Sequence, residues 1–392
     1  MQYRLDKKSQ NELSVLGFGC MRLPRVMGKT DIEKSQALIM DAIEKGINFF
    51  DCAYLYPGSE VTLGTILEKN QVREKVYIST KLPLFKCQQY EDFDRLFNEQ
   101  LRRLKTNYVD YYFMHNFSTI ADWERLCSIG VEKWIEKQKK DGKIKQIGFS
   151  FHGAKGEFTK LVDAWDWQFA MIQYNYVNTH YQAGTDGLKY AHAKGLSVFV
   201  MEPLLGGRLA NNLPKKAQDL FAAADPNSTP ASWGLRWVLN HPEVTLLLSG
   251  MNELEQIAQN TIIATQTLPN TMTDKEMEII QQVEKIFSDS YKIPCTGCNY
   301  CLPCPKGINI PDSFMAYNTS YSINRFAGIQ QYATTTGGFS PTFSVRHCTD
   351  CKKCEKECPQ DIKISDRLKD VAKRMEPLWY RAAMGIARRV MS

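Results

Sequence analysis

Residues 47–69 read INFFDCAYLYPGSEVTLGTILEK. The short apolar run at its start predicts a strand over 47–52, and the apolar spacing after Pro57 and Gly58 predicts a helix over 59–69. The same order of strand and helix recurs along the chain. We expect the other strands at 14–19, 76–81, 109–115, 145–150, 170–175, 197–202 and 244–249, and one of the helices between them at 121–141. Eight such units favour an α/β fold in which parallel strands close into a (β/α)8 TIM barrel.

The alternative architecture is an open, doubly wound sheet. Such a sheet usually carries a glycine-rich phosphate turn after its first strand. Here the first predicted strand leads into Gly17-Phe18-Gly19-Cys20-Met21-Arg22, which is not such a turn. The alternation stops near residue 265, and a helix expected at 273–288 leads into a cysteine-rich segment. A Thr/Gly-rich stretch, Thr334–Gly338, is expected to be a mobile loop.

The composition is that of an ordinary globular protein. The 392 residues include 49 Lys+Arg and 43 Asp+Glu, a net charge of +6, with 43% hydrophobic and 23% charged residues. These values exclude a disordered or coiled-coil chain, and a charge this small over this length gives no reason to expect a nucleic-acid partner. No apolar run is long enough to span a membrane. The first ten residues are polar and contain no signal-peptide core, so we expect a cytoplasmic protein.

Cysteine is the informative residue type, because eight of the twelve cysteines lie between 295 and 358. They form two runs, each followed by proline: Cys295, Cys298, Cys301, Cys304 and Cys348, Cys351, Cys354, Cys358. The second run has the C-x2-C-x2-C-x3-C-P spacing of bacterial ferredoxins, and the first is one residue shorter before its last cysteine. Structural zinc would also accept four thiolates, but usually from two separated pairs. Disulfides would need an oxidising compartment.

Several ionisable side chains fall where predicted barrel strands end. Asp51, Lys81 and His115 close the second, third and fourth strands, and Tyr54 and Tyr56 follow Asp51 in its loop. The carboxyl ends of barrel strands form one rim, where catalytic residues gather, so we expect these side chains to meet. A lysine ammonium beside a tyrosine would favour the tyrosinate form and make the phenol a better acid.

These residues resemble the aldo/keto reductase superfamily over roughly residues 1–270. The segment FDCAYLYPGSE is similar to its Asp-x-Ala-x-x-Tyr-Gly motif, with Asp51 and Tyr56 five apart, and Lys81 and His115 match the rest of its catalytic tetrad. The resemblance implies that Tyr56 donates a proton, that Asp51 orients Lys81 and that His115 positions a substrate carbonyl. The segments IGFS, IQYN and PLLGGRL match further family segments. The whole chain resembles a bacterial and archaeal subgroup with a C-terminal ferredoxin-like [4Fe-4S] domain, which CTGCNYCLPCPKGI and VMEPLLGG support. We therefore expect a barrel over 1–270, a linker helix and ferredoxin-like domain over 271–375, and a helical tail over 376–392.

The resemblance implies a nicotinamide cofactor, with departures from the family pattern. Ser150 and Gln173 match residues that hold the carboxamide, but Phe151 replaces the usual asparagine and Met201 the usual stacking aromatic. Backbone N–H groups at Gly206 and Gly207 would approach a pyrophosphate. The candidate residues for the other end of the nucleotide are Gly250, Glu253, Gln256 and Asn260. Gly250 and Gln256 stand where relatives that use NADP carry Lys and Arg, and Glu253 would repel a 2′-phosphate, so NAD is expected over NADP.

By resemblance to two-cluster ferredoxins, the fourth cysteine of each run serves the other cluster. One [4Fe-4S] cluster is then expected on Cys295, Cys298, Cys301 and Cys358, and a second on Cys348, Cys351, Cys354 and Cys304. We expect an oxidoreductase that interconverts a carbonyl and an alcohol, with clusters that relay electrons to a ferredoxin or flavoprotein partner. Two alternatives stay open: a ferredoxin-linked enzyme with a flavin in the barrel, and a non-enzymatic electron-transfer or redox-sensing protein with a vestigial barrel.

Overall fold

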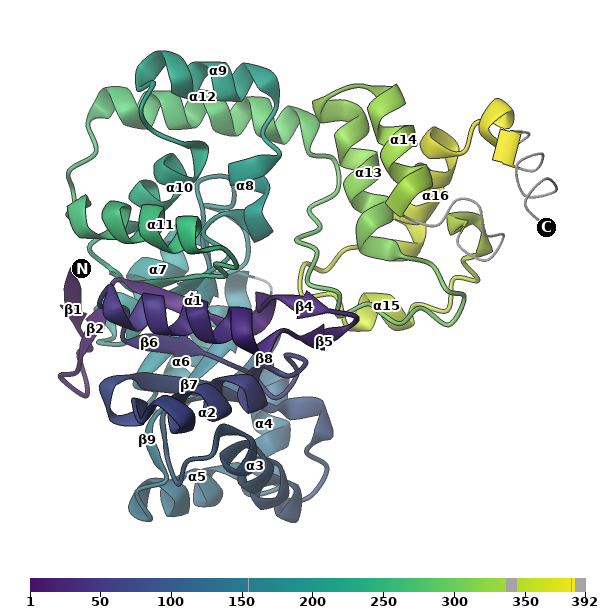
Figure 1. Ribbon diagram of the computed structural model, residues 1–392. Coiled ribbons are helices and arrows are strands. Elements are labelled where there is room, and N and C mark those ends of the chain that lie inside the picture. Colours follow the sequence, from purple (N-terminus) through teal and green to yellow (C-terminus); the bar gives the residue numbers. More distant parts are fainter. Residues whose placement is uncertain (154, 336–343, 382, 385–392) are drawn as a thin grey trace. The chain divides into compact units, whose positions relative to one another are not determined.

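The computed structural model describes residues 1–153, 155–335, 344–381 and 383–384 (Figure 1). The chain divides into two compact units. The first consists of Met1–Pro203 and Gly234–Met272, and the second of Leu204–Trp233 and the chain from Thr273 onward. Thr334 and Thr335 end a helix, and the rest of the expected loop at Thr334–Gly338 lies outside the described residues. Of the expected tail over 376–392, residues 378–381, 383 and 384 are helical, and 382 and 385–392 lie outside them.

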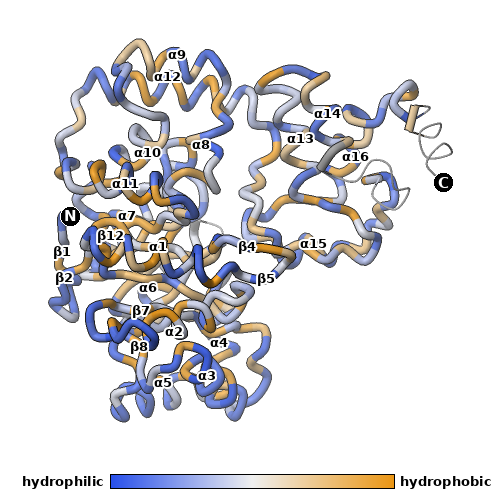
Figure 2. The backbone as a smooth tube through the Cα atoms, viewed as in Figure 1, coloured by the Kyte–Doolittle hydropathy of each residue, from blue (hydrophilic) through white to orange (hydrophobic). Residues whose placement is uncertain are grey.

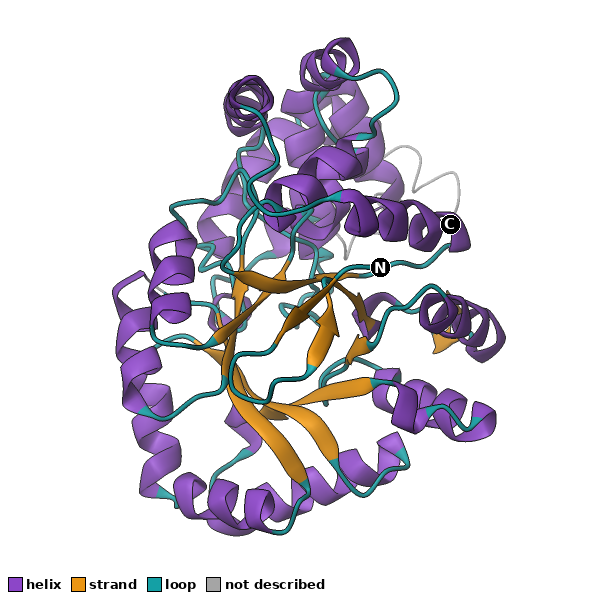
Figure 3. Cartoon of the chain, turned by 90° about the vertical axis from the view of Figure 1, so that its left-hand side faces the viewer, coloured by secondary structure: helices purple, strands orange, loops and turns teal. Residues whose placement is uncertain are grey.

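The first unit contains a closed barrel of eight parallel strands, which confirms the expected fold class. Figure 3 shows the strands ringed by helices. The strands follow one another in chain order around the barrel, and β12 pairs with β3 to close it. They are β3 (Leu16–Gly19), β6 (Phe49–Asp51), β7 (Tyr77–Pro83), β8 (Val109–Phe117), β9 (Ile144–Phe151), β10 (Phe169–Gln173), β11 (Ser197–Met201) and β12 (Val244–Ser249). Closure therefore brings the first and eighth βα units together.

The barrel interior is a packed core. Its buried cluster consists of Leu13, Phe49, Tyr111, Phe113, Phe169, Met171, Phe199, Leu246 and Leu248. The rings of Phe169 and Phe199 stack with centroids 5.1 Å apart. A Cβ on Gly148 of β9 would lie 2.3 Å from the Phe169 carbonyl oxygen, so this position needs glycine for close approach of the strands. Because bulky side chains fill the middle of the barrel, chemistry is confined to its ends.

Helices follow the barrel strands in sequence. They are α1 (Ile32–Glu44), α2 (Ser59–Asn70), α3 (Tyr90–Leu104), α4 (Ile120–Ser128), α5 (Val131–Lys140), α6 (Lys155–Ala164), α7 (Gly184–Ala193), α10 (Pro230–Leu239) and α11 (Leu254–Gln266). The single helix expected over 121–141 is wrong. Gly130, with φ +89°, adopts the left-handed conformation and separates α4 from α5.

Two short hairpins and several 3-10 turns complete the first 210 residues. The hairpins pair β1 (Tyr3–Leu5) with β2 (Glu12–Ser14), and β4 (Arg25–Val26) with β5 (Lys29–Thr30). The turns are η1 (Cys20–Arg22), η2 (Arg73–Lys75), η3 (Leu84–Lys86) and η4 (Leu205–Gly207). None of these short elements was expected from the sequence, since two or three residues carry no periodicity. No helix among the described residues has the length and apolar character needed to cross a membrane.

The second unit is largely helical. It contains α8 (Arg208–Asn211), α9 (Lys215–Ala224), α12 (Asp274–Ser290), α13 (Ile310–Ser322), α14 (Arg325–Thr335), η6 (Val345–His347), α15 (Lys353–Lys356) and α16 (Ile364–Met375). The helix α12 begins with a capping box at Thr273 and buries Ile280, Val283 and Phe287. Figure 2 shows the resulting alternation of hydrophilic and hydrophobic turns along α12, which lies beside α9.

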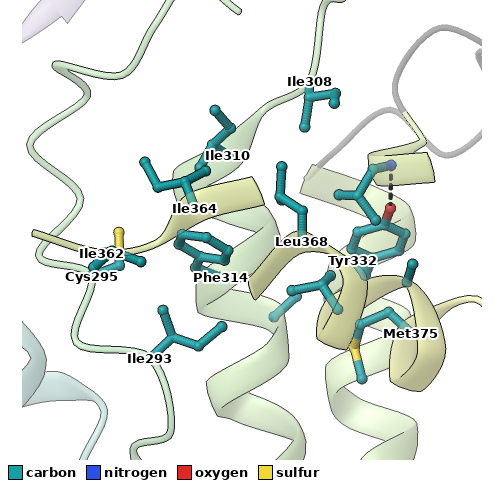
Figure 4. Packing of buried hydrophobic residues seen from close by; sticks show 14 of the residues in the cluster. Ile293, Cys295, Ile308, Ile310, Phe314, Tyr332, Ile362, Ile364, Leu368 and Met375 are labelled. Carbon is teal, nitrogen blue, oxygen red and sulfur yellow. Dashed lines mark hydrogen bonds between the residues drawn. The ribbon is translucent and has the colours of Figure 1, made fainter. Parts of the chain in front are cut away.

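A separate apolar core holds the cysteine-rich part of this unit together. Phe314 of α13 lies among Ile310, Ile364 and Leu368, as Figure 4 shows. At the edge of this core the Tyr332 hydroxyl accepts a hydrogen bond from the Val345 N–H at 3.2 Å and donates one to Glu376 at 2.5 Å. Burying a large apolar side chain such as Phe314 contributes about 1.5–3 kcal/mol to stability. The cysteine loops are therefore attached to a folded scaffold.

Candidate active site and cysteine cavities

The four expected catalytic side chains come from one stretch of the barrel rim. Asp51 ends β6, and Lys81 and His115 lie near the ends of the next two strands, β7 and β8. Tyr56 lies in the loop between β6 and α2. Parallel strands place their carboxyl ends at the same edge, so neighbouring strands bring these groups together.

Lys81 is the centre of this arrangement and is only 1% exposed. Its ammonium donates to the Asp51 carboxylate at 2.5 Å and to the Cys52 carbonyl oxygen at 2.6 Å. The Ser79 hydroxyl donates to the same Asp51 oxygen at 2.7 Å. A buried charge is tolerated only when it is paired and hydrogen-bonded, and both conditions are met here.

Tyr56 and His115 both face this ion pair. The Lys81 ammonium lies 4.8 Å from the centroid of the half-buried Tyr56 ring. The Tyr56 and His115 rings meet edge to face, with centroids 6.0 Å apart and planes at 83°. A phenol, an imidazole and an ammonium thus share one small volume. Together they can give a proton to an oxygen atom and stabilise the charge left behind.

The electrostatics of the rim keep His115 neutral. Burial lowers the pKa of His115 well below its usual range, and the positive charge of Lys81 lowers it further. The neighbouring His152 is affected in the same way, because burial lowers its pKa to about 4. A neutral imidazole can donate a hydrogen bond to a carbonyl oxygen without adding a second positive charge beside Lys81.

The candidate nicotinamide residues lie at the ends of the next three strands. Ser150 is on β9, Gln173 ends β10 and Met201 ends β11, where Gln173 and Met201 are partners in the strand register. The Ser150 hydroxyl accepts from the Asn116 N–H at 2.8 Å. Gln173 is fully buried, and its amide nitrogen and oxygen find no hydrogen-bond partner among the described residues. Such orphaned donor and acceptor atoms suit a ligand carboxamide, so this position fits a nicotinamide.

Phe151 cannot replace the asparagine of the family pattern. Side chains alternate along a strand, so Phe151 points away from Ser150. It is fully buried, and its ring packs against Phe158 of α6 with centroids 5.1 Å apart. Phe151 therefore offers no hydrogen bond to a carboxamide.

The loop after β12 and the helix α11 contain the candidates for the far end of a nucleotide, with Gly250 and Glu253 in the loop and Gln256 and Asn260 in α11. Gln256 accepts from the Asn252 N–H at 2.9 Å, and the buried Asn260 donates to Ser249 at 3.2 Å. Glu253 forms a 2.7 Å ion pair with Lys34 of α1. A Cβ on Gly250 would lie 3.4 Å from the Arg22 side chain. Two cations, Lys34 and Arg22, therefore accompany this loop.

Sequence reasoning missed several members of this site. Ser79 could have been found, because it lies two residues before Lys81 and so on the same face of β7. Lys34 and Arg22 could not, because only barrel closure brings the first βα unit beside the eighth. Cys52 belongs to the site through its carbonyl oxygen, which accepts from the Lys81 ammonium. Burial and contact with Cys20 raise the pKa of the Cys52 thiol well above its usual range.

The Gly206-Gly207 turn belongs to the second unit. Both residues have positive φ, +66° and +90°, in a 3-10 turn that leads into α8. The first residue of α8, Arg208, is 6% exposed, and its guanidinium lies 5.4 Å from the centroid of the Tyr291 ring. The Tyr291 hydroxyl donates to the Cys295 carbonyl oxygen at 2.5 Å.

The eight cysteines line two cavities, each with thiols from both runs. The first is lined by Cys295, Cys298, Cys301 and Cys358 and by apolar side chains that include Phe314 and Ile364. The second, of about 280 Å³, is lined by Cys304, Cys348, Cys351 and Cys354, and Cys301 also borders it. Figure 4 shows Cys295 beside Ile362, next to the apolar core. The lining of each cavity contains the crossed set of four cysteines expected by resemblance.

The two runs have the same backbone turns. In the first, Gly297 and Asn299 have φ of +70° and +67°; in the second, Asp350 and Lys352 have φ of +53° and +56°. These left-handed residues stand between successive cysteines at matching places and curl each loop around its cavity.

The chemistry of the donor set suits iron–sulfur clusters. Burial raises the pKa of Cys301, and the adjacent thiols of Cys295 and Cys298 raise it further. Bound cations would favour ionisation of the Cys301 thiol. Four thiols spaced around a cavity match a cluster with iron at several corners.

Comparison with known proteins identifies the family. Residues 15–285 match the model of the aldo/keto reductase family. The chain belongs to the aldo/keto reductase family. Residues 294–364 match a 4Fe-4S dicluster domain. This aldo/keto reductase is therefore an oxidoreductase with an iron–sulfur domain after its barrel.

Named relatives are distant. L-galactose dehydrogenase of Arabidopsis thaliana is 27% identical over 305 residues, which are 70% of this chain and 91% of that protein. Glyoxal reductase of Bacillus subtilis is 29% identical over 213 residues, 52% of this chain and 69% of that protein. The solved structure of aldo-keto reductase AKR11C1 from Bacillus halodurans, in its holo form, matches with a TM-score of 0.60 and 23% identity over 72% of this chain and 96% of that one. This structural likeness supports the fold.

Proposed function

We propose that the barrel interconverts a carbonyl and an alcohol with a nicotinamide dinucleotide, and that the second unit carries two [4Fe-4S] clusters that transfer single electrons. The observation that carries the first part is the position of Lys81. Its ammonium is fixed by Asp51 and the Cys52 carbonyl and lies 4.8 Å from the centre of the Tyr56 ring. We place the protein in the cytoplasm, where thiols stay reduced.

The proposed reduction follows from the charges at the rim. A bound nicotinamide supplies or accepts the hydride. Tyr56 donates its phenolic proton to the substrate oxygen as that oxygen gains negative charge. Lys81 stabilises the phenolate that remains, and Asp51 keeps the ammonium in place. Neutral His115 donates a hydrogen bond to the same oxygen. The alcohol then carries the hydride on carbon and the Tyr56 proton on oxygen, and Tyr56 recovers a proton from water.

We propose that Ser150 and Gln173 hold the carboxamide, with Met201 beside the ring, and that Gly250, Glu253, Gln256 and Asn260 lie at the adenosine end. The unpartnered amide of Gln173 supports the first assignment. Glu253 disfavours a 2′-phosphate, whereas its ion pair with Lys34 offsets part of that repulsion. The proposed preference for NAD over NADP is therefore modest. Gly206 and Gly207 stay candidates for the pyrophosphate because of their backbone conformation alone.

For the clusters we propose the crossed ligand sets that line the two cavities. Cys295, Cys298, Cys301 and Cys358 would hold one cluster, and Cys348, Cys351, Cys354 and Cys304 the other. Iron–sulfur clusters accept and release one electron at a time, whereas a hydride carries two. If the two chemistries are coupled, a flavin or a flavoprotein partner must convert between them.

The test compares Tyr56→Phe with Tyr54→Phe in protein purified without oxygen. Tyr54 is a matched control, because its ring lies 4.3 Å from the Arg103 guanidinium and does not need its hydroxyl for that contact. With NADH or NADPH and a panel of aldehydes and ketones, Tyr56→Phe should lose at least 100-fold in turnover, and Tyr54→Phe should keep it. Full turnover in Tyr56→Phe would reassign the acid. Iron content and electron paramagnetic resonance test the clusters independently, and flavin absorbance would favour a flavin in the barrel.

A further inference from the structure

The two cysteine cavities differ in their charged surroundings. Among the described residues, no Asp, Glu, Lys, Arg or His lines the cavity of Cys295, Cys298, Cys301 and Cys358. The cavity of Cys304, Cys348, Cys351 and Cys354 is lined in addition by Lys306, Lys352, Lys353 and Lys356, which we call the lysine rim. Cys351 is exposed, whereas Cys295 is 8% exposed. The first cavity thus has no charged lining residue besides its cysteines, whereas the second is basic and includes an exposed cysteine.

The lysine rim keeps its positive charge available to a partner. All four lysines are exposed, and none forms an ion pair with another described residue. The nearby acids offset part of this charge, and Asp366 of α16 is close enough to Lys352 for the two charges to attract each other. Glu357 lines the same cavity, whereas Glu355 accepts hydrogen bonds from the N–H and hydroxyl of Ser365. Neighbouring basic side chains are already paired, Lys363 with Asp361 and Lys369 with Asp366.

Unpaired like charges around one opening repel one another and gain energy when an anionic surface approaches. A stretch of lysines that served solubility alone would not need to surround the thiols. Cys301 borders both cavities, so the basic cavity lies directly beside the other set of thiols. The second cavity therefore has the position of an entry point for electrons.

We propose that the lysine rim is the docking surface for an acidic electron-carrier protein of the ferredoxin type. This inference rests on the proposed iron–sulfur function and adds the site and the charge of the partner. In the transfer, one electron leaves the reduced carrier, which becomes oxidised, and enters the cluster held by Cys304, Cys348, Cys351 and Cys354, which becomes reduced. No bond and no proton is transferred.

The experiment measures the second-order rate of cluster reduction by stopped flow, in full-length protein with its clusters. The probe is a two-cluster bacterial ferredoxin of net negative charge, reduced beforehand. The test variant replaces the lysine rim by glutamine at all four positions. The matched control replaces four exposed lysines of the same unit that do not line the cavity: Lys216, Lys275, Lys285 and Lys373. Both variants lose the same net charge.

We expect the wild-type rate to fall as salt is added, because salt screens the attraction. At low salt the rim variant should be at least tenfold slower and nearly insensitive to salt, and the control should change by less than about threefold. With a basic cytochrome c as electron acceptor the rim variant should instead be faster than wild type. Single Lys306→Gln and Lys353→Gln variants should show part of each effect.

Three results would overturn the docking surface: a wild-type rate that does not depend on salt, an equal loss in the control variant, or a slower rim variant with both carriers. A shift in cluster midpoint potential that accounts for the rate change would also overturn it, because the lysines would then tune the cluster. If the purified protein contains no iron, or if dithionite does not reduce it, the result contradicts the proposed iron–sulfur function and not the docking surface.

Discussion

Lys81 and Asp51 form a 2.5 Å ion pair whose side chains are 1% and 4% exposed. Each is the other's charge partner, so removing one leaves the other buried and uncompensated, at a cost of about 3–5 kcal/mol. We expect Asp51→Asn and Lys81→Met each to lower the free energy of unfolding by an amount of this order. The double variant should lose less than the sum, because no lone charge remains. Urea unfolding followed by tryptophan fluorescence measures this cycle. Additive losses would mean that the pair does not couple, and reductase turnover should be lost in all three variants.

Protonation of the rim histidines should link stability to pH. Burial lowers the pKa of both His115 and His152 in the folded chain, to about 4 for His152. Below the unfolded value of about 6.5 the unfolded chain therefore binds more protons, and the folded state loses stability as pH falls. Between its folded and its unfolded pKa, each histidine should lower the free energy of unfolding by about 1.4 kcal/mol for each unit that the pH falls. Above about pH 6.5 the stabilisation from the neutral histidines is fully present.

The measurement compares urea unfolding between pH 7.5 and 4.5 for wild type, His115→Asn and His152→Asn. Each variant should show a smaller slope than wild type, and the exposed His180→Asn should not. Equal slopes in all four proteins would show that neither rim histidine is neutral in the fold.

Lys34 should influence the choice of nucleotide through Glu253. The 2.7 Å ion pair offsets the negative charge of Glu253, so Lys34→Ala should increase its repulsion of a 2′-phosphate. We expect the affinity for NADPH to fall about 2- to 5-fold relative to NADH, a change of about 0.4–1 kcal/mol, because both side chains are partly exposed. Glu253→Gln should change the ratio in the opposite direction. Isothermal titration with both nucleotides measures it, and the exposed Lys69→Ala is the control. A ratio unchanged in both variants would remove this loop from the nucleotide site.

The sequence predicted the repeated elements well, because burial of both barrel faces leaves apolar runs that recur with each unit. Lys81 and His115 could be placed at the rim for the same reason. Properties that depend on closure or on single backbone angles were missed. Lys34 pairs with Glu253 only because β12 pairs with β3, and Gly130 breaks a helix through its left-handed conformation. The helices α13 and α14 of the second unit have weak amphipathic patterns, so their periodicity does not predict them from the sequence.

Arg208 is a buried cation beside the Cys295–Cys298 loop. Its guanidinium lies 5.4 Å from the centroid of the Tyr291 ring, and a Cβ on Gly297 would come within 3.9 Å of its Nη2 atom. Reduction adds negative charge to a cluster, and a nearby cation stabilises that charge, so Arg208 should raise the midpoint potential of the cluster in this loop. Arg208→Gln should lower this midpoint potential. Each tenfold change in the equilibrium constant for one-electron reduction corresponds to a shift of about 59 mV. Only one of the two clusters should respond, because the other belongs to the second cavity.

Redox titration followed by electron paramagnetic resonance separates the two potentials. Arg208→Lys keeps the charge and should retain most of the wild-type value, whereas the exposed Lys216→Gln should leave both clusters unchanged. A shift in Arg208→Lys as large as in Arg208→Gln would mean that packing against Tyr291, and not charge, is the contribution of Arg208. A shift of both clusters together would mean that the cation acts on the whole unit and not on the loop it contacts.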